Sequence, residues 1–284
     1  MKISKSIAIR NIAKHCEALG LQFFDNYFIR NEDNLIEQYD DWDLIKSEIN
    51  EGGGKELNGK KAKFKAIHSS SALCLNTFAP IKQFIGDFSF LDDSAFTYSR
   101  FEKRFKTGIS YPFLDFYIEN NNSLYAFESK YIEHLTPKLP NWIGSSETVG
   151  NLQKYVNRQN ELTLPNKFVD EILQYYINCN TKMYLDVSQL IKHAIGIIRS
   201  PAELKKTLVY IYWLPINHND FELFEKHEAE IQEFKERLLP FNSYINFHSI
   251  SYLDFWNSLE KNERFGNHIK KVKQRYNIKV NNDK

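Results

Sequence analysis

Two carboxylates and one ammonium group, those of Asp115, Glu128 and Lys130, lie within a single aromatic-rich segment, residues 111–131. Two neighbouring carboxylates suit a hard divalent cation, because Mg²⁺ usually takes one or two protein carboxylates and completes its octahedron with water and substrate phosphate. A lysine beside them could then act on an attacking water or on the charge that builds at phosphorus. The residue types therefore point to metal-assisted chemistry at phosphorus.

A β-hairpin would bring these side chains together. Two apolar and aromatic runs flank a polar Asn-Asn-Asn-Ser cluster, which is the pattern of two antiparallel strands and a tight loop. If the cluster is the loop, Glu119 pairs with Leu124, and counting back sets Asp115 opposite Glu128. Opposed residues share a face, and Lys130, two residues further on, shares it too. Charge among Phe and Tyr neighbours is costly unless metal or substrate compensates it.

The short pattern acidic-X-Lys occurs more than once, so its context has to select among the copies. The copies are Glu128-Ser129-Lys130, Glu203-Leu204-Lys205 and Glu233-Phe234-Lys235. The second follows Ser-Pro at an apparent helix start, and the charges around the third recur at helical spacing. Only the first lies on a predicted strand preceded by a strand with an Asp. The alternative for this copy is an edge hairpin with solvated charges.

The composition predicts a globular protein. Of the 284 residues, 42% are hydrophobic and 15% aromatic, which argues against disorder. The 37 basic and 36 acidic side chains give a formal charge of +1, so contact with nucleic acid would need a local basic patch. Cys16, Cys74 and Cys179 lie far apart without CxxC or Cys/His spacing, which indicates neither a disulfide framework nor a zinc site.

The lengths of the apolar stretches in the sequence indicate whether the protein crosses a membrane or is secreted. None approaches the roughly 18 residues of a membrane span. The start, MKISKSIAIRNIAKH, lacks the uninterrupted apolar core of a signal peptide. We therefore expect a soluble, cytoplasmic protein with no membrane partner.

A basic loop follows three consecutive glycines. Its lysines are Lys55, Lys60, Lys61, Lys63 and Lys65. This local excess of positive charge could meet phosphates or could remain solvated. The phosphate-cradling pattern GxxxxGK[ST] is absent, so a P-loop is excluded. A GxSxG elbow is also absent, which argues against a serine hydrolase.

Two further elements carry polar residues that could reach the hairpin. A strand just before it carries Glu102, which could project toward Asp115 or remain a surface charge paired with a neighbour. A helix beyond it places Gln189 and His193 four residues apart, so both side chains point to one side. For His193 a structural or solvated role is the alternative.

The middle of the chain is predicted to run helix, three strands, helix, strand. The corresponding ranges are 70–83, 97–105, 113–118, 124–130, 186–198 and 207–214. Residues 151–180 also show a helical pattern.

This αβββαβ order and the Asp115, Glu128-Ser129-Lys130 arrangement resemble the core and the active-site signature of the PD-(D/E)XK nuclease superfamily. The resemblance is closer to one mainly microbial, restriction-endonuclease-like family within it. The blocks that carry it are GGGKEL (52–57), KFKAIHSSSALCLNTFAP (63–80), FEKRFKTG (101–108), PFLDF (112–116), AFESKYIEHL (126–135), QLIKHAIG (189–196) and LVYIYWLP (208–215).

The resemblance implies an α/β (α+β) fold with a mixed central sheet flanked by helices and with helical additions at both ends. We expect an N-terminal helical extension with the basic loop over residues 1–64. The nuclease core would cover residues 65–215. A C-terminal α/β extension, residues 216–284, would pack on that core, so that the whole forms one domain.

The resemblance also implies roles for individual residues. Asp115 and Glu128 would bind the metal, Lys130 would assist the attacking water, and Glu102 would be a further acidic member. Gln189 is similar to a helical Gln of some related nucleases, in which a Tyr commonly follows four residues later. Here that position is His193.

The expected function is that of a Mg²⁺-dependent endonuclease, with Mn²⁺ as a substitute, acting on double-stranded DNA in restriction, defence or repair. Lys55, Lys60, Lys61, Lys63 and His193 would contact the nucleic acid. A homodimer would be needed to cut both strands of a palindrome symmetrically. The alternative is a catalytically inactive nuclease-fold protein that binds DNA or serves as a scaffold.

Overall fold

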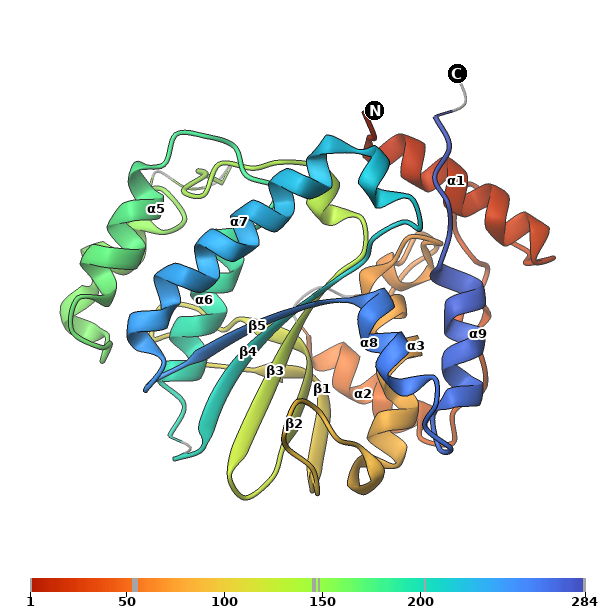
Figure 1. Ribbon diagram of the computed structural model, residues 1–284, viewed down its shortest axis with the longest axis horizontal. Helices are drawn as coiled ribbons and strands as arrows, with labels where there is room; N and C mark the ends of the chain where they lie inside the picture. Colours follow the sequence, from red (N-terminus) through yellow and green to blue (C-terminus); the bar gives the residue numbers. More distant parts are fainter. Residues whose placement is uncertain (1, 53–55, 145–146, 148, 202, 283–284) are drawn as a thin grey trace.

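The computed structural model describes residues 2–52, 56–144, 147, 149–201 and 203–282. Within these residues, five strands form one mixed sheet in the spatial order β1-β2-β3-β4-β5 (Figure 1). The strands are β1 (Tyr98–Arg104), β2 (Phe113–Glu119), β3 (Ser123–Lys130), β4 (Lys205–Tyr212) and β5 (Asn246–Ser251). β1 and β3 each run antiparallel to β2, whereas β4 and β5 continue the sheet in parallel to β3.

The predicted hairpin is confirmed in its register. Glu119 pairs with Leu124, and the pairing continues to Phe116 opposite Phe127. The loop is closed by the side chain of Asn120, whose Oδ1 accepts hydrogen bonds from two backbone amides of the Asn-Asn-Asn-Ser cluster. Such a local side-chain bond is what favours Asn in tight turns. The sequence therefore fixes where the chain reverses.

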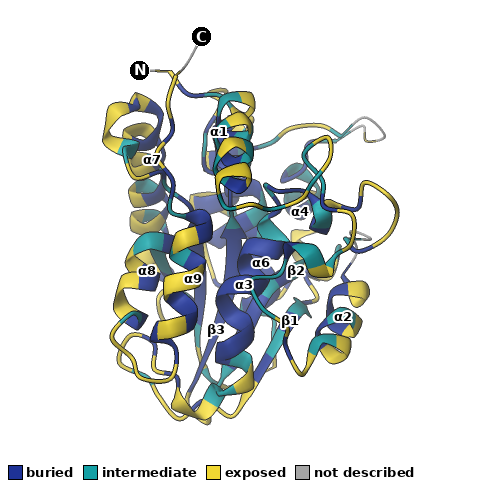
Figure 2. Ribbon diagram, turned by 90° about the vertical axis from the view of Figure 1, so that its right-hand side faces the viewer, coloured by how far each residue is buried: buried dark blue, intermediate teal, exposed yellow. Residues whose placement is uncertain are grey.

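Helices cover both faces of the sheet, because the apolar side chains of the strands alternate between two cores. Phe116, Phe127 and Val209 enter the core beneath α1 (Lys5–Ala18), α3 (Ser70–Gln83), α8 (Tyr252–Leu259) and α9 (Gly266–Tyr276). Leu124 and Leu208 enter the opposite core, against α6 (Val187–Ile198), α7 (Glu222–Leu238) and α5 (Gln174–Asn178). α3 and α6 are the most deeply enclosed helices, as the dark ribbon in Figure 2 shows.

The αβββαβ order predicted for the middle of the chain is confirmed by α3, β1, β2, β3, α6 and β4. The helical prediction for residues 151–180 is confirmed in part, because the segment is helical but broken into short pieces. It contains α4 (Gln153–Asn157), a 3₁₀ turn (Gln159–Glu161), a π-helical turn (Val169–Leu173) and α5. Pro165 interrupts the pattern, since a proline disfavours helical geometry in the residue before it.

The remaining regular elements are short or peripheral. α2 (Trp42–Glu51) packs beside the edge strand β1. Turns of 3₁₀ helix cover Glu32–Asn34, Lys63–Lys65, Ile85–Asp87, Glu133–Leu135, Gln159–Glu161, His218–Asp220 and Leu239–Phe241. Across the described ranges, no helix combines the length and the apolar character that crossing a bilayer requires.

Asn76, buried in α3, ties both ends of the chain to the middle. Its Oδ1 accepts a hydrogen bond from the amide of Ile36 at 2.9 Å. Its Nδ2 donates to the carbonyl oxygen of Asn34 and to the hydroxyl of Tyr276, each at 2.8 Å. Because Tyr276 lies in α9, one amide group joins the N-terminal segment, α3 and the C-terminal helix.

Replacing Asn76 should therefore destabilise the whole protein. We expect Asn76→Ala to lower the free energy of unfolding by about 3 kcal/mol, because several buried groups lose their hydrogen-bond partner at once. Denaturant unfolding followed by circular dichroism would measure this. Asn267→Ala, at an exposed position of α9, is the matched control and should change stability little. Equal effects of the two substitutions would contradict this role of Asn76.

Candidate active site

The last residues of β3 and the first two turns of α6 form the candidate site. β3 ends with Glu128, Ser129 and Lys130, and α6 carries Gln189 and His193. α6 lies against the sheet because its apolar residues are buried there. These are Val187, Leu190, Ile191, Ala194, Ile195 and Ile197. Spacing of four residues along the helix then turns Gln189 and His193 toward β3.

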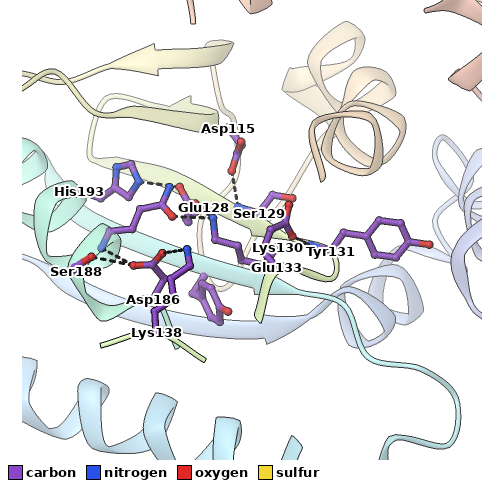
Figure 3. A network of polar contacts seen from close by, with 12 residues as sticks. Asp115, Glu128, Ser129, Lys130, Tyr131, Glu133, Lys138, Asp186, Ser188 and His193 are labelled. Atoms are coloured by element: carbon purple, nitrogen blue, oxygen red, sulfur yellow. Dashed lines mark hydrogen bonds and ion pairs between the residues drawn. The ribbon is translucent and has the colours of Figure 1, made fainter. Parts of the chain in front are cut away.

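Glu128 is buried, with 2% of its side chain exposed. One of its carboxylate oxygens contacts Lys130 and the other contacts His193 (Figure 3). Oε1 accepts a hydrogen bond from Nζ of Lys130. Oε2 lies 2.8 Å from Nε2 of His193. Burial alone would raise the pKa of Glu128, but Lys130 and His193 outweigh burial and lower this pKa to about 2. Glu128 is therefore an ionised carboxylate.

Lys130 is held between two acceptors. Besides its bond to Glu128, its Nζ donates to Oε1 of Gln189 at 2.9 Å. Burial works against the charged form, but the carboxylates of Glu128, Glu133 and Asp115 outweigh burial and raise the pKa of Lys130 above its usual range. Lys130 is thus a fixed ammonium group. It also lines a cavity of about 190 Å³ together with Glu133 and Gln189.

Asp115 lies on β2 and points at the backbone of β3. Its Oδ2 accepts a hydrogen bond from the amide of Ser129 at 2.6 Å. Among the residues that the structure describes, none donates a hydrogen bond to its other oxygen, Oδ1. Burial, together with the charges of Glu128 and Glu102, raises the pKa of Asp115 well above its usual value. A cation bound at Asp115, in addition to the nearby Lys130, would relieve the repulsion among these carboxylates.

Glu102 is the third carboxylate in the same row of the sheet. Because Phe101 pairs with Phe116 and Lys103 with Leu114, the register sets Glu102 opposite Asp115. The sequence prediction that Glu102 projects toward the site gains support from this register. Glu102 has a φ of 50°, an uncommon left-handed conformation for a side-chain-bearing residue. Burial and the charges of Glu56 and Glu128 raise its pKa to about 8.

These carboxylates fit a hard divalent cation by donor type and by charge. Asp115 retains a free oxygen, and burial together with mutual repulsion raises the pKa of both Asp115 and Glu102. Glu128, in contrast, already has Lys130 and His193 as partners. Within the described ranges, no three His, Cys, Asp or Glu side chains converge into a ready-made metal site. Metal binding would therefore require some rearrangement around Glu128.

Asp186 and Lys138 form an ion pair in this neighbourhood that the sequence did not show. Asp186 caps α6, since its Oδ1 accepts the amide hydrogen bond of Gln189 at 3.2 Å. Its Oδ2 also accepts a hydrogen bond from Nζ of Lys138 at 2.9 Å. Burial raises the pKa of Asp186, but Lys138 outweighs this and lowers the pKa to about 2. The capping role of Asp186 was detectable from the sequence. Its ion pair with Lys138 was not, because that pair joins segments that lie far apart in the chain.

The basic loop reaches the site only in part. Lys63 contacts Glu56 at 3.1 Å, and both line a cavity with His68 and Glu133. Lys61 contacts Asp25 at 2.5 Å instead, and Lys60 is exposed. Lys55 lies outside the described residues. His193 is buried against Glu128, so nucleic acid could reach it only after that contact opens.

A mixed five-stranded sheet flanked by helices, with Glu128 and Lys130 at the end of its central strand, is consistent with a restriction-endonuclease-like fold. Residues 12–277 match the family described as "Restriction Endonuclease associating with ARP", and the chain belongs to that family. Comparisons with curated proteins and with solved structures give no significant match. The family supports a nuclease-like function.

The contacts of Lys130 predict how its pKa responds to substitution. Glu128→Gln removes the carboxylate that favours the ammonium form most, so we expect the pKa of Lys130 to fall. Glu133→Gln removes a weaker favourable charge and should lower this pKa less. NMR titration of the lysine ammonium resonance would measure both changes, with circular dichroism as the check on folding. An unchanged pKa in Glu128→Gln would contradict the proposed pairing.

Proposed function

We propose that this protein is a metal-dependent endonuclease of the PD-(D/E)XK type that hydrolyses phosphodiester bonds of double-stranded DNA. The observation that carries the proposal is the position of Lys130. Its ammonium group lies between the Glu128 carboxylate and the Gln189 amide oxygen, at the wall of a cavity. Family membership supports the nuclease part of the proposal.

Mg²⁺, or Mn²⁺ in its place, would be held by Asp115, Glu128 and Glu102. When bound, such a cation offsets phosphate charge and lowers the pKa of a coordinated water. The chain itself prepares for this by keeping Asp115 fixed to the amide of Ser129, with Oδ1 left available. Carboxylates that repel one another gain the most from a cation, because it neutralises the charge that raises their pKa.

Lys130 would stabilise the reacting phosphate and orient the attacking water by donating hydrogen bonds. Both of its protein partners are acceptors, so it acts as a donor and as a positive charge. Gln189 would position the ammonium group from α6. His193 would keep Glu128 in place, at the position where a Tyr is common in similar nucleases. An already placed donor is effective because it needs no reorganisation as charge develops.

Contact with the DNA backbone would come from Lys60, Lys61 and Lys63, with Lys55 as a further candidate. Lys61 and Lys63 have carboxylate partners at present, and phosphates would replace these. Such contacts position the duplex without reading its sequence. Cutting both strands symmetrically would call for a homodimer.

One observation favours a second candidate, a nuclease-fold protein that binds DNA or serves as a scaffold without turnover. Both oxygens of Glu128 already have partners, so the Glu128 cluster is compensated without a metal. Against this candidate, burial and mutual repulsion disfavour the ionised forms of Asp115 and Glu102, an unfavourable arrangement that a purely structural site has no reason to keep.

Cleavage of supercoiled plasmid would test the proposal. We expect wild type to nick or linearise it with Mg²⁺ or Mn²⁺ and to be inactive with EDTA. Lys130→Ala should reduce the cleavage rate at least a hundredfold, on the order of what one stabilising donor supplies. Lys235→Ala, in the exposed acidic-X-Lys copy of α7, and Glu203→Ala are matched controls and should retain full activity. Metal-independent cleavage, or loss of cleavage in the controls, would contradict the assignment.

A further inference from the structure

We infer that a cavity beside Trp142 receives a single unstacked nucleobase of the substrate, next to the phosphate on which Lys130 acts. The inference rests on the proposed function and adds a binding subsite to it. The cavity has a volume of about 270 Å³ and shares Gln189 and Asp186 with the cavity that Lys130 lines. The two spaces therefore meet at the start of α6.

Trp142 presents its ring to this cavity while remaining 42% exposed. Its neighbours on the same loop, Leu139 and Ile143, are 39% and 61% exposed. Tyr111, next to the cavity-lining Pro112, is 51% exposed. Exposed apolar residues that follow or precede the residues lining a cavity favour a binding surface over a core.

The loop that carries Trp142 is held in place by hydrogen bonds. The carbonyl oxygen of Trp142 accepts a bond from the amide of Asn151 at 2.9 Å. Oδ1 of Asn141 accepts bonds from the amides of Leu152 and Gln153, at 2.8 and 3.2 Å. The exposure of the ring is thus imposed by the backbone around it. A pre-placed ring binds with little loss of conformational entropy.

The walls of the cavity combine the groups that recognise a nucleotide. Phe113 and Trp142 supply aromatic surface, and a base of any identity can stack on such a surface. The Gln189 amide supplies hydrogen-bonding groups for a base edge, and Lys192 supplies a positive charge for a phosphate. A protein partner would need a longer apolar groove than this cavity provides.

The place of this cavity next to Lys130 indicates which nucleotide of the substrate would supply the base. A base in this cavity would contact Gln189, which also lines the cavity of about 190 Å³ beside Lys130. It therefore belongs to a nucleotide at or next to the cleaved bond. Enzymes gain selectivity from such extrusion, because mismatched, modified or single-stranded bases unstack most easily.

Tryptophan fluorescence and DNA affinity would test this together, with Ca²⁺ in place of Mg²⁺ to prevent turnover. We expect duplex DNA to quench the emission of wild type. Trp142→Ala should lose that quenching and bind roughly ten- to a hundredfold more weakly, on the scale of one lost base stack. Trp142→Phe should regain most of the affinity, since it keeps an aromatic face.

Tyr244→Ala is the matched control, an exposed aromatic residue just before β5, near the opposite end of the sheet, and should bind like wild type. Tight DNA binding by Trp142→Ala would overturn the subsite and leave the proposed nuclease intact. Failure of wild type to bind DNA at all would overturn the proposed function and the subsite with it. Equal losses in Trp142→Ala and Tyr244→Ala would show a general effect on folding and overturn the subsite alone.

Discussion

A carboxylate buried at the end of the central strand sets the constraint on which this structure depends. Glu128 is removed from water, so its charge is tolerated only because Lys130 and His193 contact it from two elements. Lys130 reaches it from the same strand, whereas His193 reaches it only if α6 packs on β3. The apolar face of α6 therefore both fills the core and places His193 against Glu128. Removing Lys130 would leave the buried Glu128 carboxylate without its ammonium partner, which is strongly destabilising.

The row of acids across β1, β2 and β3 is the complementary feature. Glu102, Asp115 and Glu128 follow one line through three adjacent strands, and the first of them adopts a φ of 50°. Like charges in one row, and an uncommon backbone conformation beside them, are unfavourable for folding. The rest of the sheet has regular pairing and apolar faces on both sides. Departures from local rules that cluster in one place mark a functional site.

The sequence predicted well what depends on local pattern. The Asn-rich loop and alternating strands predicted the hairpin register, which the structure shows from Glu119 opposite Leu124 to Phe116 opposite Phe127. Asp115 follows this ladder directly and accepts the amide hydrogen bond of Ser129, next to Glu128. The pairing of His193 with Glu128 could not be predicted, because the packing angle of α6 decides which group its side chain meets. The ion pair of Lys138 with Asp186 likewise depends on how a long loop returns to the helix. The helical spacing of residues 151–180 predicted helix but not its interruption, because Pro165 disfavours helical geometry in the residue before it.

We propose that the row of carboxylates binds a divalent cation. Isothermal titration calorimetry of Mn²⁺ into wild type and Asp115→Asn tests this most directly, with no substrate involved. We expect saturable binding in wild type and its loss in the variant, because Asp115 supplies the available oxygen while folding is unaffected. Equal binding by both proteins, or no binding by a folded wild type, would contradict it.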